Sequence, residues 1–185
     1  MKNKKDYFNK CFSPNWVEVD LNTRTITVPK TQSELGVQDD MNAEIFWFAV
    51  PRYFEGQDLG DPRKKWLVHT TVSNPNAAAR EILLPIKYRE TQKADENNRL
   101  SNIDFTATVS TANGTKRETT PGILLGWPIT YDITKYPGNV SFALRCYEIN
   151  EDKNIIFSLG TKPATGKITP SYSLNGQVIP DGADT

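Results

Sequence analysis

The apolar residues of this chain come in short runs separated by polar residues and turn formers, a pattern typical of β-strands. The run at 45–50, Ile-Phe-Trp-Phe-Ala-Val, is rich in aromatic and β-branched residues and is closed by Pro51. Because it is too short for a free-standing buried helix, it predicts a strand. Both faces of this strand are apolar, whereas a strand of an antiparallel sandwich usually has one polar face. We therefore expect cover on both faces, from the domain core and from a second surface.

Most other runs alternate apolar and polar residues with the period of two that is expected of half-buried strands. The clearest alternation lies at 103–109, with Ile103 facing inward, and Asn113-Gly114 after it is a strong signal for a β-hairpin. A second hairpin is expected around Asn22. The other expected strands are 16–20, 24–28, 66–72, 82–88, 122–129, 140–147, 155–159 and 165–168.

Proline, glycine and charged residues mark the expected breaks. Pro85 lies inside an apolar run and therefore predicts an edge strand or a bulge. The segments 30–41 and 73–79 are expected to be loops, the second with at most one helical turn. The segment 90–102 is polar and predicts an exposed excursion, and one helical turn is expected at 132–135.

These elements predict an all-β fold. About nine or ten short strands with frequent turn signals and no long helical pattern favour an antiparallel β-sandwich, similar to an immunoglobulin domain or a jelly roll. The sandwich is expected over 16–168, between an N-terminal arm at 1–15 and a C-terminal tail or linker at 169–185. Tyr7 and Phe12 make the arm a candidate for docking on a neighbouring subunit.

Composition narrows the function classes. The chain has 185 residues, and its 22 Lys and Arg balance its 22 Asp and Glu. Because phosphate binding normally requires a basic excess, nucleic acid is not expected as a partner. No apolar run is long enough to span a membrane, and no secretory signal is recognised, so assembly in a cytoplasm is expected. Cys11 and Cys146 are accordingly expected to be unpaired thiols.

No constellation of residues predicts catalysis. The sequence has no phosphate-binding loop, nucleophile elbow or metalloprotease motif, so we do not expect an enzyme, a metal or a cofactor. His69 is the only histidine and has no catalytic neighbour in sequence. The Asp39-Asp40 pair lacks the ordered oxygen ligands of a calcium loop and is interpreted as part of a solvated loop.

Three stretches carry a resemblance to a known family. They are Arg24-Thr-Ile-Thr-Val-Pro29 with Leu35-Gly-Val37; residues 42–53 with Gly56 and Asp58-Leu59; and Gly126-Trp127 followed by 136–147, Phe157-Ser-Leu159 and Pro163-Ala-Thr165. In order and spacing, over about residues 16 to 168, they resemble the N-terminal domain of the upper baseplate protein family of tailed phages of Gram-positive bacteria, a domain also found in phage head fibre proteins.

The resemblance implies a β-sandwich that anchors an adsorption appendage to a virion. This chain differs in its N-terminal extension and in a larger polar excursion around 73–102, and no fibre or receptor-binding module is expected after the domain. The expected role is thus a structural adaptor or anchor subunit of a baseplate or fibre, or alternatively a head fibre or decoration protein on the capsid. Other virion proteins are the expected partners.

A homo-oligomer, either a trimer or a larger ring, is expected because symmetric assembly would bury the second apolar faces. The candidate interface residues are Phe46, Trp47 and Phe48, since large buried aromatic side chains dominate interface energies. Each of the three is alternatively a core residue.

A carbohydrate-binding module for host-surface glycans is the alternative from another class. It would use exposed aromatic rings that stack on sugars, and the candidates are Trp66, Trp127, Tyr131 and Tyr136. The favoured interpretation of the two tryptophans is that they fill the core.

Overall fold

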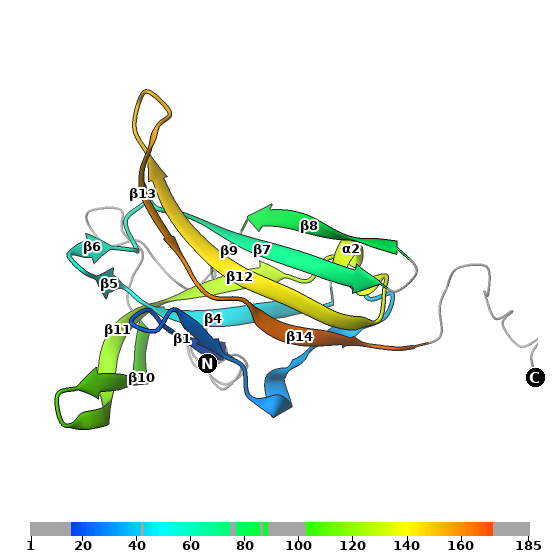
Figure 1. The fold of residues 1–185 in the computed structure, drawn as a ribbon, viewed down its shortest axis with the longest axis horizontal. Coiled ribbons are helices and arrows are strands. Elements are labelled where there is room, and N and C mark those ends of the chain that lie inside the picture. The colour runs from blue at the N-terminus through cyan, green and yellow to red at the C-terminus, as the bar shows by residue number, and fades with distance from the viewer. Residues whose placement is uncertain (1–15, 42, 75–76, 86, 89–102, 172–185) are drawn as a thin grey trace, which may run out of the picture.

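The protein is a β-sandwich in the computed structural model (Figure 1), which describes residues 16–41, 43–74, 77–85, 87–88 and 103–171. Two six-stranded sheets and one two-stranded sheet account for most of these residues. The helical elements are a single 3₁₀ turn, η1 (Lys30–Gln32), and a single α-helical turn, α2 (Tyr131–Thr134). The prediction of an all-β sandwich is therefore confirmed.

Each large sheet has one strand attached beside its main path. The first sheet consists, in spatial order, of β10 (Ile103–Thr111), β11 (Gly114–Pro128), β4 (Ile45–Pro51), β1 (Trp16–Asp20) and β2 (Thr25–Thr27), with β9 (Lys87–Tyr88) paired to β11. The second consists of β3 (Glu34–Val37), β14 (Ala164–Thr169), β12 (Gly138–Ile149), β7 (Lys65–Asn74) and β8 (Ala77–Pro85), with β13 (Ile155–Gly160) paired to β12. The two-stranded sheet is formed by β5 (Tyr53–Phe54) and β6 (Gln57–Asp58).

Most strand pairs of the two large sheets are antiparallel, as predicted, but each sheet also contains one parallel pair. β1 pairs with β4 in parallel, and so does β3 with β14. Parallel neighbours need a long connection, and here each pair joins segments that are distant in sequence. The described residues also contain fourteen strands rather than nine or ten, because two-residue strands such as β5, β6 and β9 leave no periodic pattern.

Two segments expected to be loops contain regular structure. The segment 30–41 holds η1 and β3, because Leu35 is buried in the core and brings its strand onto the edge of the second sheet. The segment 73–79 includes the end of β7 and the start of β8, where Asn74 pairs with Ala77. The excursion at 90–102 and the arm at 1–15 lie outside the described residues, as do the side chains of β10.

Local turn chemistry was predicted well. The β1–β2 hairpin forms around Asn22, and β10 and β11 form the hairpin signalled by Asn113-Gly114. Gly114 has a φ of +117°, a left-handed conformation that favours glycine. Pro85 ends β8, which is an edge strand as predicted, and β9 then pairs in the opposite sheet.

The main core lies between the two large sheets. Its centre is a cluster of four rings from β4, β11 and β12, whose centroids lie 5.1 to 6.5 Å apart. They are Phe46, Phe48, Trp127 and Phe142. Most of these pairs are edge-to-face or tilted, the geometry that aromatic quadrupoles favour. The alternation of β12 is confirmed, since Val140, Phe142, Leu144 and Cys146 are all buried.

The second apolar face of β4 is also buried. Trp47, Ala49 and Leu124 form a separate small cluster on the other side of the first sheet, and Trp16 packs against it. Ala49 and Leu124 are fully buried, and only 8% of Trp47 is exposed. The Trp47 ring lies so close to Gly126 that a Cβ atom there would meet it at 2.7 Å. Most of this face is thus covered in the single chain.

Candidate interaction surface

Two hairpins project beyond the sandwich, one formed by β10 and β11 and the other by β12 and β13 (Figure 1). β12 is twelve residues long, and its distal end pairs with β13 from Arg145↔Gly160 to Ile149↔Ile155. A register shift next to Glu148 indicates a β-bulge in the stem. We call the residues from Ile149 to Ile156 the hairpin tip.

The turn of the hairpin tip is held by its own backbone. The Asn150 N–H donates to the Asn154 carbonyl at 2.9 Å, and the Lys153 N–H donates to the Asn150 carbonyl at 3.0 Å. The Asn150 side-chain oxygen accepts a further bond from the Asn154 N–H at 2.9 Å. Lys153 has a φ of +61°, in the left-handed region that glycine occupies most readily. The turn is thus a defined structure rather than a loose loop.

The hairpin tip exposes three large aliphatic side chains. Ile149, Ile155 and Ile156 are 44%, 67% and 58% exposed. Single exposed apolar residues are normal on protein surfaces, but several gathered on one projecting element indicate an interaction site. The intervening turn residues, among them Glu151, Asp152 and Lys153, are exposed and charged.

A buried ion pair fixes the stem of the hairpin to the sandwich. The Lys64 Nζ atom donates to Glu148 Oε1 at 2.5 Å, and only 5% of the Lys64 side chain is exposed. The same ammonium group lies 4.9 Å from the centre of the Phe157 ring, on β13. Because both hairpin strands contact Lys64, the pair restrains the direction in which the hairpin projects. Removing one partner would leave a buried unpaired charge.

Cys146 lies next to this ion pair, on the inner face of β12. It is a free, buried thiol, as the sequence suggested, and burial raises its pKa to about 12. Glu148 raises this pKa further, whereas Lys64 acts in the opposite direction. The thiol therefore stays protonated at neutral pH. Cys11 lies outside the described residues.

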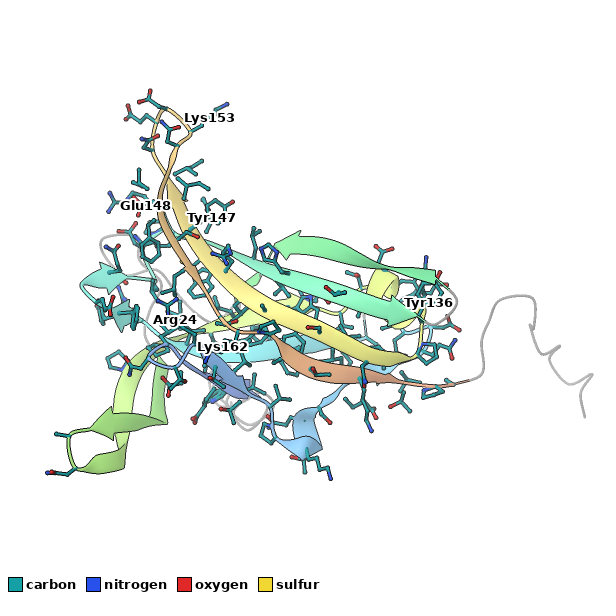
Figure 2. All side chains as sticks on the ribbon, viewed as in Figure 1. Arg24, Tyr136, Tyr147, Glu148, Lys153 and Lys162 are labelled. Carbon is teal, nitrogen blue, oxygen red and sulfur yellow. The ribbon has the colours of Figure 1, made fainter. Side chains whose placement is uncertain are left out.

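A second ion pair supports the neighbouring β5–β6 hairpin. Arg52, which is 4% exposed, binds Asp58 through its Nε atom at 3.0 Å. Asp58 also accepts the Gly60 backbone N–H. Close by, Arg24 donates to the Gly160 carbonyl at 3.1 Å and lies over the Phe54 ring. Figure 2 shows Arg24 and Lys162 near the base of the projecting hairpin and Lys153 at its end.

The residues proposed from sequence as interface anchors occupy different places. Phe48 is fully buried and Phe46 is half-buried against the main core, so both pack inside the sandwich. Trp47 lies on the opposite face of the first sheet, in the small cluster described above. Tyr7 and Phe12 lie outside the described residues.

The candidate sugar-binding rings do not form one platform. Trp66 and Trp127 are 5% and 0% exposed and belong to the main core, as the favoured interpretation held. The Trp66 Nε1–H donates to the Leu59 carbonyl at 3.3 Å. Tyr131 and Tyr136 are half-buried, and Lys135 lies over the Tyr136 ring at 5.0 Å.

Asp40 and His69, which the sequence analysis also considered, occupy defined positions in the fold. The Asp40 carboxylate accepts the Val37 backbone N–H at 3.0 Å, so it stabilises the local turn. His69 is half-buried on β7, opposite Ala143 of β12. Among the described residues, no group of three or more His, Cys, Asp and Glu side chains is placed to hold a metal ion.

Sequence reasoning missed the hairpin tip as a site. The two strands and the turn were predicted, but their pattern could not show that β12 and β13 extend past the sandwich. A signal was present in Ile155-Ile156, where two isoleucines follow a polar turn directly and do not alternate with polar residues.

Comparison with family models and with curated proteins identifies no relative. No protein-family model matches the sequence, and no curated protein matches it significantly. In the part of the chain that the structure describes, no helix is long and apolar enough to cross a membrane.

Proposed function

We propose that this protein is a structural virion subunit of a tailed bacteriophage, an adaptor or anchor in a baseplate or fibre appendage that acts through protein–protein contacts. The observation that carries the proposal is the hairpin tip, an apolar projection that is exposed and rigidly mounted. Three isoleucines at its end would gain by burial against a partner. The Lys64–Glu148 pair holds the hairpin in place before any partner binds, which lowers the entropy cost of association.

The resemblance of the sequence to the upper baseplate domain supports the same function. Its stretches fall on several elements that build the sandwich, including β4, the β5–β6 hairpin and β12–β13. The alternative is a head fibre or decoration protein mounted on the capsid, because the domain that the sequence resembles is also found in phage head fibre proteins. Both placements make the protein a component of the particle rather than an enzyme.

The test is to locate the chain in purified particles of the phage that encodes it. Mass spectrometry of the particles should detect its peptides, and a gold-labelled antibody should decorate the tail end. Label on the capsid would favour the head fibre placement. Particles that lack the chain altogether would contradict the proposal.

A carbohydrate-binding function is tested separately on a glycan array. The half-buried Tyr131 and Tyr136 are the described candidates for stacking, and Tyr136→Ala would then remove binding. We expect no glycan-dependent signal from the wild-type protein. Reproducible binding that Tyr136→Ala abolishes would favour the carbohydrate-binding module instead.

A further inference from the structure

We propose that the partner of the hairpin tip is the hairpin tip of a second copy of this chain, laid antiparallel to it across a twofold axis. This inference rests on the proposed function, because it names the partner for the same surface. It is carried by the order of side chains along the outer face of the hairpin.

That order follows from strand alternation and register. Arg145, Tyr147 and Ile149 alternate on β12 with buried residues, so all three lie on the outer face of the second sheet. Register places Lys65 of β7 beside Tyr147 and places Ile155 beside Ile149. The outer face therefore has cations at the stem and aliphatic residues toward the tip.

The stem cations are held on the surface. Arg145 and Lys65 are both exposed. The Arg145 Nη1 atom donates to the Ser158 hydroxyl at 2.8 Å, and its guanidinium lies against Gly160 of β13. The guanidinium keeps further N–H donors for an acidic partner.

The turn beyond the isoleucines is mainly acidic, in contrast to the basic stem. It carries two exposed acids, Glu151 and Asp152, and one lysine, Lys153. Glu151 and Asp152 lie in the turn that follows β12, and Arg145 lies four residues before Ile149 on the strand, roughly 13 Å away. The apolar zone thus lies between an acidic end and a basic end.

A surface with this order is complementary to itself when it is reversed. A twofold axis through the isoleucines would bring the aliphatic zones of two copies together and set the acids of each turn over the Lys65 and Arg145 of the other. A parallel arrangement would instead oppose like charges, which is unfavourable. Closed twofold interfaces require this kind of self-complementarity.

The test is a charge exchange between tip and stem. The tip variant combines Glu151→Lys and Asp152→Lys, and the stem variant combines Lys65→Glu and Arg145→Glu. All four side chains are exposed, so both variants should fold, which the melting temperature checks. Lys167→Glu, an exposed reversal on β14, is the matched control.

Mass in solution is measured by light scattering over a dilution series. We expect wild type and Lys167→Glu to form dimers and each hairpin variant alone to be monomeric. An equimolar mixture of the tip and stem variants should recover a dimer with one copy of each, because both tip–stem contacts are then attractive.

Two results would overturn the pairing. One is a wild-type protein that stays monomeric, and the other is an oligomer whose mass neither variant changes. If the chain is nevertheless found in particles, the proposed function stands and the hairpin tip binds a different virion protein. If the chain is absent from the particles, the proposed function itself is contradicted, whatever mass the protein has in solution.

Discussion

Strand β4 and the hairpin tip are both rich in apolar residues, but the fold treats them in opposite ways. β4 lies inside the first sheet with β1 and β11 on either side, and its side chains from Trp47 to Val50 are buried toward both faces. The hairpin tip extends past the sandwich, so its isoleucines stay exposed. An apolar run therefore becomes part of the core or an interaction surface according to whether another layer of the fold covers it.

Truncation of Phe48 should have the largest effect on stability. Phe48→Ala leaves a cavity at the centre of the four-ring cluster and should lower the free energy of unfolding by about 3 to 5 kcal/mol. Ile155→Ala, at the exposed tip, should change it by less than about 0.5 kcal/mol. Urea unfolding measures both values. Equal losses would contradict the division into core and surface.

Breaking the ion pair at the hairpin stem should be nearly as costly. Glu148→Ala leaves the buried Lys64 ammonium unpaired and should destabilise the fold by about 3 kcal/mol or more. Lys64→Met combined with Glu148→Leu removes both charges and should restore most of the loss. If the double variant is as unstable as the single one, the pair does more than neutralise a buried charge.

Alkaline pH should weaken the fold through Cys146. Its pKa is raised from 9.0 to about 12 in the folded chain, so the unfolded chain loses this proton first. The contribution of the protonated Cys146 thiol to the free energy of unfolding is complete below about pH 9. It falls by about 1.4 kcal/mol per pH unit as the pH rises toward 12. Cys146→Val should remove this component of the pH profile. An unchanged profile in that variant would refute the assignment.

A small gain in stability is expected from a substitution at Lys153. Its left-handed backbone favours glycine, so Lys153→Gly should raise stability by up to about 1 kcal/mol. Thermal unfolding of the variant measures the gain. A clear loss of stability would mean that the Lys153 side chain supports the turn.

Local features of the fold were accessible from the sequence, and non-local ones were not. Alternation located β12 and β7, and turn chemistry located the hairpin at Asn113-Gly114. The parallel pairing of β1 with β4 has no local signal, because it depends on how the two sheets close around the core. β3 was missed because four residues are too few for a period.

The site was less predictable than the fold. Phe46, Trp47 and Phe48 stand out in the sequence because they are large and consecutive, yet the structure packs two of them toward the main core. The isoleucines of the hairpin tip look like an ordinary strand, and only the projection of β12 and β13 makes them a surface. The Lys64–Glu148 contact joins residues 84 positions apart and has no sequence signature.

The most direct test of the account compares the solution mass of wild type with that of Ile155→Ser combined with Ile156→Ser, by light scattering across a dilution series. We expect wild type to associate and the variant to be monomeric with an unchanged melting temperature. Equal masses for the two proteins at every dilution would contradict the claim that this chain assembles through the hairpin tip.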